Sequence, residues 1–515
     1  VVIAGEYQPA CVHRLAHALN QSLGNVGTTV TYAPTVEVNS TDQAASLRDL
    51  AQAMDAGQVE LLVIFGSNPV FTAPSDLKFQ ERLGKVALSV CHSLYANETS
   101  TYCHWNLPEA HALESWGDAR AYDGTVTVMQ PLIAPLYEGR SLQEVLAGFI
   151  DAQSGKSGHD LVKDYWTRAY GGQVGGYTIT DAAGQPFRNT DTFWKHVLHD
   201  GFIPGTAAAG QSQASGSGPS ALGVSGSAPP SQSPTPNAQS QGGSGLEIIF
   251  RPDPTIWDGR FANNGWLQEL PKPLTKITWD PTAWVSPRLA ESHGLKDGDI
   301  IELKYRGNTA KLPVTIVPGH PDGAVTAFFG YGRHVVGRVG QAADDVAKEF
   351  NIYKLRTSDA LWFGSGLEIT KAGGRYTIAR TQEHHLMEAR DPVRVKTLQE
   401  YRKDPKVIEH MQHTPPRTMT MIPEWEYKGY KWGMSIDLSS CTGCGTCTIA
   451  CVAENNIPVV GKDQVNRGRE MHWIRVDHYF AGEDMDNPET YHQPVPCMQC
   501  ENAPCEVVCP VGATT

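Results

Sequence analysis

Eight of the 11 cysteines are gathered in two groups near the C-terminal end of the sequence. Their positions are Cys441, Cys444, Cys447 and Cys451 in the first group and Cys497, Cys500, Cys505 and Cys509 in the second. A disulfide scaffold would spread its cysteines through a small secreted domain. Because these cysteines lie close together at the end of a large protein, their grouping predicts that they bind metal.

The spacing within each group indicates the kind of metal centre. The first group follows the pattern C-x2-C-x2-C-x3-C, which is typical of iron–sulfur proteins. Three cysteines on a tight loop reach three corners of one 4Fe-4S cluster, and the fourth, on the following short helix, serves a neighbouring cluster. We expect Gly443 and Gly445 to let backbone amides approach the sulfides, and Pro510 to end the helix after the last ligand. The second group is a variant with a longer middle gap.

Zinc is the main alternative, because paired C-x2-C knuckles commonly form structural zinc sites. A zinc ion takes four ligands and has no use for a third and fourth cysteine within one run, so iron–sulfur is favoured. The sequence has no C-x-x-C-H motif for covalent c-type haem. We expect His472 and His478 to be surface or packing residues rather than ligands. Trp432 and Trp473 either shield a cluster from water or pack in the core.

The composition excludes several classes of function. The chain has 515 residues, 19% charged residues and a formal net charge of −13, so general nucleic-acid binding is not expected. No apolar run approaches the roughly 18–20 residues needed to cross a bilayer, so work at a membrane would require docking to a partner. The sequence begins at Val1 without an initiator Met and stops six residues after Cys509. We therefore expect it to be an internal portion of a longer polypeptide.

Residues 1–204 have the pattern of an α/β domain. Apolar stretches at Val1–Ala4, Leu61–Phe65 and Val86–Val90 predict buried strands, and an apolar periodicity over residues 12–19 predicts a helix. The order of strand, turn and helix predicts parallel pairing. We expect the scattered Cys11, Cys91 and Cys103 to be buried as small hydrophobic residues.

Four further regions follow. Residues 205–245 contain no charged or aromatic residue and predict a flexible Gly/Ser/Pro linker. Residues 246–390 predict an all-β, barrel-like domain from strand patterns at Ile300–Tyr305, Lys311–Val317 and Ala324–Phe329. Residues 391–430 are polar and predict a connector. Residues 431–515 predict a ferredoxin-like α+β iron–sulfur domain.

The C-terminal region resembles a known family of electron-transfer subunits. Residues 432–480 and the stretch PVPCMQCENAPCEVVCPVGATT at 494–515 look like the four-cluster iron–sulfur subunits of the molybdopterin oxidoreductase superfamily, of the polysulfide- and nitrite-reductase type. That family has four cysteine motifs, of which the first pairs with the fourth and the second with the third. The resemblance implies two further motifs beyond Thr515, and a 3Fe-4S cluster beside 4Fe-4S clusters in the full-length protein. In a simple two-cluster ferredoxin, Cys509 would instead complete the first site and Cys451 the second.

The upstream region resembles the large subunit of the same superfamily. Residues 104–136 look like its third domain, and residues 286–333 look like its C-terminal double-psi β-barrel. Gly66–Pro69 sits where active relatives contact the pterin, and we interpret it as a turn that serves the fold. In ordinary members these parts are separate subunits.

Fusion of the two parts, together with the stretches ENNIPVVGKDQV and GREMHW, resembles the iron–sulfur subunit of alternative complex III. The resemblance implies quinol oxidation and electron transfer to a periplasmic carrier, with no molybdopterin. It implies a membrane partner of the polysulfide-reductase anchor type, haem c subunits, and a peripheral position on the periplasmic face of the bacterial cytoplasmic membrane. Two other functions compete: a molybdenum enzyme acting on a sulfur or nitrogen compound, and a purely structural assembly subunit.

Overall fold

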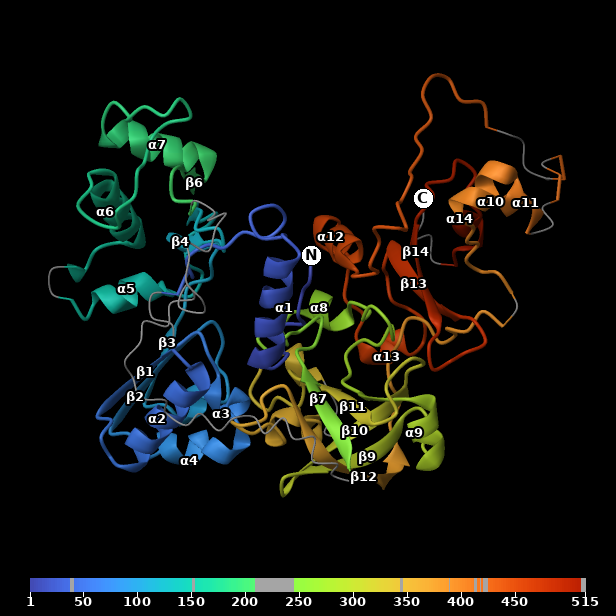
Figure 1. Ribbon diagram of the computed structural model, residues 1–515, viewed down its shortest axis with the longest axis horizontal. Coiled ribbons are helices and arrows are strands. Elements are labelled where there is room, and N and C mark those ends of the chain that lie inside the picture. The colour runs from blue at the N-terminus through green and yellow to red at the C-terminus, as the bar shows by residue number, and fades with distance from the viewer. Residues whose placement is uncertain are drawn as a thin grey trace. The chain divides into compact units, whose positions relative to one another are not determined.

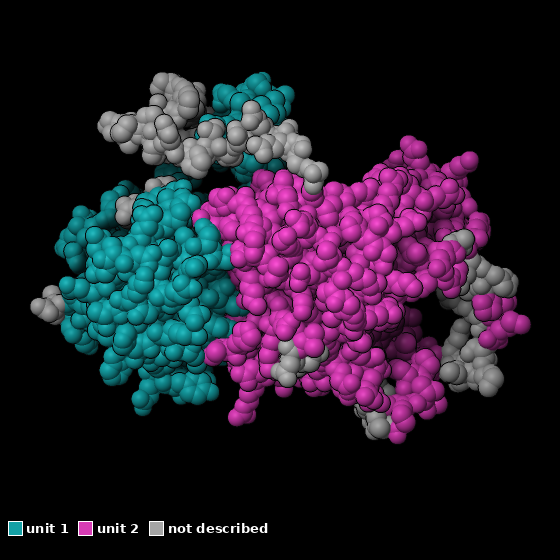
Figure 2. Space-filling model, turned by 90° about the horizontal axis from the view of Figure 1, so that it is seen from below, with its two compact units in different colours: residues 1–242 teal, residues 243–515 magenta. Residues whose placement is uncertain are grey.

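The computed structural model describes residues 1–37, 41–150, 153–208, 245–342, 346–388, 390–411, 415–416, 418–419 and 425–510. The chain divides into two compact units, Val1–Gly242 and Gly243–Thr515 (Figure 1, Figure 2). The division falls inside the linker predicted at 205–245, of which residues 209–244 lie outside the described residues. Each unit is described by itself.

Unit 1 contains the predicted parallel sheet. Strands β1 (Leu61–Phe65), β2 (Leu88–Ser93) and β3 (Trp105–Pro108) lie side by side in this order and run parallel. The strand expected at Val86–Val90 therefore starts two residues later than predicted. Helices α2 (Gln43–Asp55) and α4 (Phe79–Leu83) pack their apolar residues against this sheet.

The strand predicted at Val1–Ala4 is wrong, because residues 1–5 have no regular secondary structure. The backbone of Val2 instead pairs with a side chain: its N–H donates to Asn20 Oδ1 at 2.8 Å, and its carbonyl accepts from Asn20 Nδ2 at 2.7 Å. Because the amide of Asn20 already satisfies these groups, Val2 needs no neighbouring strand.

The first predicted helix is present as α1 (Ala10–Ser22), but its buried face differs from the expected one. Its buried residues are Ala16 and Asn20. The apolar positions that suggested the helix are exposed: Val12, Leu15, Ala18 and Leu19. Periodicity thus identified the helix but not the face that packs.

Asn68 ties the predicted turn at Gly66–Pro69 into the fold. Its Oδ1 accepts from the backbone N–H of Thr99 at 3.1 Å and from the Thr99 hydroxyl at 2.8 Å. Its Nδ2 donates to Glu98 Oε2 at 2.7 Å. These contacts support a structural role for this turn.

A second core in unit 1 lies between an antiparallel sheet and two helices. Strands β4 (Gly117–Arg120), β5 (Val126–Met129) and β6 (Phe202–Ile203) form the sheet. Helices α6 (Gly158–Tyr170) and α7 (Thr190–Asp200) contribute Trp166 and Phe193 to the core. The remaining described helices of the unit are α3 (Pro69–Thr72), α5 (Leu142–Ala147) and two 3₁₀ turns, Ser75–Leu77 and Ser100–Tyr102.

The barrel predicted in residues 246–390 is confirmed in unit 2. Six strands close in the order β10-β8-β11-β7-β12-β9. Their bounds are β7 Leu246–Arg251, β8 Ala283–Val285, β9 Asp299–Tyr305, β10 Asn308–Ile316, β11 Ala324–Phe328 and β12 Phe363–Arg375. Along β9, Ile301, Leu303 and Tyr305 are fully buried, while the residues between them are not. Every second side chain of this strand therefore points into the interior of the barrel.

The cysteine region of unit 2 combines short helices with one antiparallel hairpin (Figure 1). Its elements are α12 Thr446–Glu454, α13 Lys462–Val465, β13 Ile474–Ala481, β14 Glu489–Pro496 and α14 Pro504–Val508. The other described helices of the unit are α8 Gly265–Glu269, α9 Pro287–Ser292, α10 Leu398–Lys403 and α11 Val407–His410, with 3₁₀ turns at Gly340–Ala342, Ala347–Glu349 and Ile352–Lys354. The predicted connector 391–430 therefore contains two short helices. No helix in the part of the chain that the structure describes is both long and apolar enough to cross a membrane.

Candidate metal centre

The first cysteine group lies on a loop and the helix that follows it. Cys441 and Cys444 precede α12, whereas Cys447 and Cys451 lie on α12 itself, four residues apart and hence on one face. The backbone of Asp437 holds the start of the loop by accepting from the N–H of Cys441 at 3.1 Å. The predicted loop leading into a short helix is present, but Cys447, which was expected on the loop with Cys441 and Cys444, lies on the helix with Cys451.

Gly443 and Gly445 give this loop its shape. Both have left-handed backbone conformations, with φ of 68° and 77°, which residues with a Cβ adopt only at a cost. A Cβ on Gly443 would lie 2.2 Å from Nδ1 of His492. The loop thus contacts β14 directly, through a residue that the sequence did not single out. That these glycines let amides approach sulfide stays a prediction.

Local hydrogen bonds favour the thiolate form of Cys444. Its Sγ lies 3.1 Å from the Thr446 hydroxyl. The hydroxyl and then the backbone N–H of Thr446 hold the pKa of the Cys444 thiol below its usual range. Since the thiolate is the form that binds metal, the start of α12 prepares this side chain for ligation.

The second cysteine group surrounds α14. Cys497 and Cys500 lie on the loop after β14, Cys505 lies on α14, and Cys509 follows it directly. The N–H of Cys497 donates to the Trp473 carbonyl at 3.1 Å, which ties this loop to β13. Helix α14 ends at Val508, just before the predicted stop at Pro510.

The eight cysteines of the two groups are free thiols. None of the eight cysteines, all of them described, takes part in a disulfide bond. Within the described ranges, no three His, Cys, Asp or Glu side chains gather around one ion position. A zinc ion needs four ligands at about 2.0–2.3 Å, whereas thiolates that hold a cluster bind its separate iron corners.

Residues of the barrel domain lie next to the first cysteine loop. A Cβ on Gly445 would lie 3.6 Å from Cδ1 of Leu270 and 3.9 Å from the carbonyl of Pro271. The nearby Lys276 is only 3% exposed. Burial lowers its pKa to about 8, while the negative charges of Asp477, Cys441 and Cys447 act in the opposite direction.

Three histidines lie together beside this loop. His478 is fully buried, and among the described residues neither of its ring nitrogens has a hydrogen-bond partner; that it packs rather than binds metal stays a prediction. Its ring centroid lies 5.0 Å from that of His492 and 5.8 Å from that of His385. Burial, followed by the charges of His492, His385 and Lys276, lowers the pKa of His478 to about 3. His472 is half-buried, and burial lowers its pKa as well.

Other candidates from the sequence lie elsewhere or at the surface. Trp432 is 98% exposed and Trp473 is 52% exposed, so neither packs in the core of this chain. Cys91 is buried as predicted and Cys103 is half-buried, but the prediction for Cys11 is wrong, because that side chain is exposed on α1.

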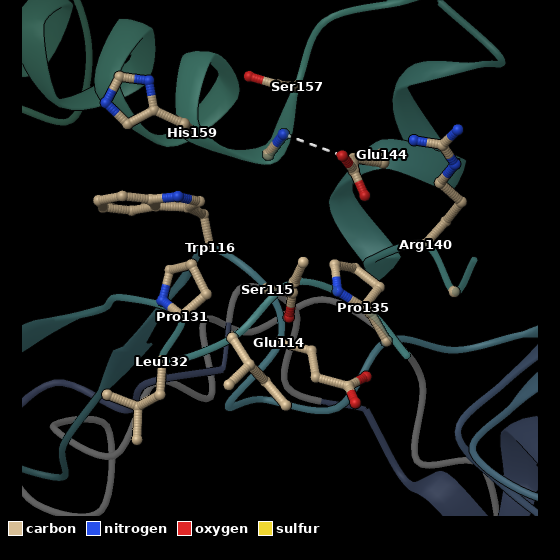
Figure 3. A pocket seen from close by; sticks show the side chains of 15 residues that line it. Glu114, Ser115, Trp116, Pro131, Leu132, Pro135, Arg140, Glu144, Ser157 and His159 are labelled. Carbon is tan, nitrogen blue, oxygen red and sulfur yellow. Dashed lines mark hydrogen bonds between the residues drawn. The ribbon is translucent and has the colours of Figure 1, made fainter. Parts of the chain in front are cut away.

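Unit 1 also contains a pocket of about 510 Å³ (Figure 3). The rings of Trp116 and His159, which both line it, are in edge-to-face contact with centroids 4.8 Å apart. The carboxyl group of Glu144 accepts from the backbone N–H of Ser141 at 2.9 Å and of Gly158 at 3.1 Å. Because this carboxyl group already caps α5 and accepts a hydrogen bond from Gly158, its role is structural. We therefore place the functional site at the cysteines.

Comparison with known proteins agrees with this placement. Residues 440–513 match the family described as "4Fe-4S dicluster domain". The C-terminal segment of this chain is a 4Fe-4S dicluster domain. Iron–sulfur ligation is thereby supported over zinc, and the exposed thiols of Cys497, Cys500 and Cys505 belong to this domain.

The dicluster domain is similar to iron–sulfur subunits of several reductases. It is 45% identical over 84 residues to the menaquinone reductase iron–sulfur cluster-binding subunit of Nitratidesulfovibrio vulgaris, covering 16% of this chain and 32% of that protein. It is 38% identical over 84 residues to the B subunit of polysulfide reductase from Wolinella succinogenes, covering 16% of this chain and 39% of that protein. The chain thus spans about a third of the length of these relatives.

Among solved structures, acetylene hydratase from Pelobacter acetylenicus is similar to this chain with a TM-score of 0.40 and 15% sequence identity. The similarity covers 64% of this chain and 47% of that protein.

Proposed function

We propose that this chain is the iron–sulfur electron-transfer subunit of a quinol-oxidising membrane complex of the alternative complex III type. The observation that carries the proposal is a dicluster domain with two cysteine groups, packed in one unit against a closed barrel. The similarity to a subunit named for menaquinone reductase supports a quinone-linked role. In this function the barrel and unit 1 are a scaffold without molybdopterin.

We assign the metal ligands to all eight cysteines of the two groups. They are Cys441, Cys444, Cys447, Cys451, Cys497, Cys500, Cys505 and Cys509. The clusters, of the 4Fe-4S type with a 3Fe-4S cluster in the full-length protein, supply one-electron storage. The chain's own residues hold and orient them: Thr446 stabilises the Cys444 thiolate, and the glycine conformations at 443 and 445 shape the loop.

We assign the partners from the exposed apolar residues near the cysteines. Tyr430, Trp432 and Met434 precede the first group, and Val507 and Val508 lie within the second; all are exposed. Large exposed apolar side chains are typical of protein–protein contacts. We propose a membrane subunit of the polysulfide-reductase anchor type and haem c subunits as partners, on the periplasmic face of the membrane.

A second candidate is a molybdopterin oxidoreductase that acts on a sulfur or nitrogen compound, with the clusters as its electron path. Its support is the similarity to the B subunit of polysulfide reductase. Molybdenum analysis of the purified complex separates the two candidates. About one molybdenum per chain supports the enzyme, and its absence beside full iron content supports the quinol-oxidising role.

The proposed function is tested with Cys441→Ser and Cys497→Ser in the purified complex, with Cys11→Ser as the matched control. Cys11 is exposed and lies in the other unit. We expect each test variant to lose iron, labile sulfide and cluster reduction by menaquinol, while the control keeps all three. Full turnover in an assembled Cys441→Ser complex would favour the purely structural role.

A further inference from the structure

The loop that follows α8 in the barrel domain lies against the first cysteine loop. Leu270 and Pro271 are the residues that a Cβ on Gly445 would meet first. The same loop carries Lys276, whose N–H donates to the Lys272 carbonyl at 3.0 Å and whose carbonyl accepts from the Thr381 N–H at 3.0 Å. The backbone of Lys276 is therefore fixed on both sides.

The conformation of Lys276 is imposed by its surroundings. Its φ is 55°, in the left-handed region that residues with a Cβ adopt only at a cost. Such a conformation persists only where neighbouring contacts determine it. The direction in which this side chain leaves the loop is thus set by the barrel rather than by local preference.

Lys276 differs from Lys272 and Lys462 of the same unit in its partners. Lys272 pairs with Asp253 at 3.5 Å, and Lys462 pairs with Asp280 at 3.0 Å. Among the described residues, the Lys276 ammonium forms no hydrogen bond and no ion pair within 4.0 Å, although the residue is 3% exposed.

The charges that act on the Lys276 ammonium are those of Asp477, Cys441 and Cys447. Asp477 already accepts from Nε of Arg475 at 3.0 Å, which offsets its charge. Cys441 and Cys447 lie near enough to act electrostatically on the Lys276 ammonium. Burial is the main cause that lowers the pKa of His385, His478 and His492, and the positive charge of Lys276 acts in the same direction on each.

We propose that Lys276 is a positioning charge that raises the reduction potential of the cluster bound by Cys441, Cys444 and Cys447. This inference rests on the proposed function, since it requires that the cysteines hold a cluster. Reduction adds one electron from the quinol to the cluster, and no bond forms or breaks at Lys276. A fixed cation in a poorly polarisable interior stabilises the more negative, reduced state. The barrel is then part of the electron-transfer machinery.

The experiment is a redox titration of the purified full-length protein, followed by electron paramagnetic resonance, for Lys276→Met, Lys276→Gln and Lys276→Arg. Lys304→Met is the matched control, because that lysine is exposed and pairs with Glu368. We expect the two neutral variants to lower the ratio of reduced to oxidised cluster at least tenfold at a fixed potential. This corresponds to about 59 mV for one electron. The shift should affect one cluster, and the arginine and control variants should keep the original potential.

An unchanged potential in a neutral variant with an intact cluster signal would overturn the inference. Loss of this cluster from both neutral variants, with the cluster retained in the arginine variant, would overturn it, because the charge would then be needed to bind the cluster rather than to set its potential. Loss of the cluster from all three variants would also overturn it, because the shape of the lysine side chain, rather than its charge, would then be what the cluster requires. If the unsubstituted protein contains no iron or labile sulfide, the proposed function fails instead.

Discussion

Gly443 shows how a single residue without a side chain shapes the metal centre. Its left-handed φ of 68° and the proximity of the His492 imidazole leave no room for a Cβ. The loop that carries Cys441 and Cys444 can therefore close against β14 only with glycine at this position.

We predict that Gly443→Ala destabilises unit 2 and weakens cluster binding. The left-handed conformation alone costs about 1–2 kcal/mol for a residue with a Cβ, and the contact with His492 adds to this. Urea unfolding and iron content measure the effect. Gly433→Ala is the control, since a Cβ there would meet nothing within 4 Å. Equal stability of the two variants would contradict this account.

His478 predicts a pH dependence of stability. Burial, with the charges of His492, His385 and Lys276, lowers its pKa in the folded protein to about 3, against about 6.5 in the unfolded chain. The unfolded state therefore binds one more proton between these values, and stability is lost as the pH falls below about 6.5. The loss is at most about 1.4 kcal/mol per pH unit.

Urea unfolding at pH 7 and pH 5 measures this effect. We expect His478→Phe to lose less stability between these pH values than the unsubstituted protein. His384→Gln is the control, because that histidine is exposed. Equal losses of stability in the His478→Phe protein and the unsubstituted protein would show that another group is responsible for the pH dependence.

At the scale of elements, the barrel and the cysteine region are joined through Glu269 at the end of α8. This carboxyl group is 2% exposed. It accepts from the backbone N–H groups of Val460 at 3.1 Å and Gly461 at 2.8 Å, and from Trp279 Nε1 at 3.2 Å. Nearby, Trp266 Nε1 donates to the Ile457 carbonyl at 2.9 Å. The segment before α13 is thus hydrogen-bonded to the barrel.

We predict that Glu269→Gln destabilises unit 2 by about 1–3 kcal/mol, the cost of leaving a buried donor unsatisfied. An amide has one acceptor oxygen where the carboxyl group uses two, and its NH₂ faces donors. Denaturant unfolding measures the change, with the exposed Glu368→Gln as control. A stability equal to that of the control would show that the segment is held by other contacts.

At the scale of the molecule, each unit has its own core. Unit 1 buries Trp166 and Phe193 in one cluster and Met54 and Leu83 in another. The described contacts of the first cysteine loop to Leu270 and His492, and of the segment before α13 to Glu269, all lie within unit 2.

We therefore predict that residues 243–515 produced alone bind as much iron per chain as the same chain with unit 1. Residues 431–515 alone should bind less than half as much, because they lack Glu269, Leu270 and Lys276. Iron and sulfide analysis after anaerobic reconstitution checks both. Equal iron in the two fragments would contradict a role for the barrel in supporting the centre.

The sequence by itself determined the type of metal centre and much of the barrel. The spacing from Cys441 to Cys451 predicts a loop and a short helix because neighbouring residues alone build them, and α12 confirms the helix. Strands β9 and β11 were located to within one residue of each end, because alternating apolar residues in β9 and a short apolar run in β11 are local signals of a buried strand.

Only the tertiary structure decided what surrounds the cysteines. Glu269 meets Gly461 across 192 positions of the chain, and Lys276 and His492 belong to elements with no motif of their own. Spacing and periodicity report contacts between neighbours in sequence, whereas these charges and rings come together only when the barrel closes and packs. The failure to predict the buried face of α1 has the same origin: local pattern specifies a helix, but its packing partner chooses the face.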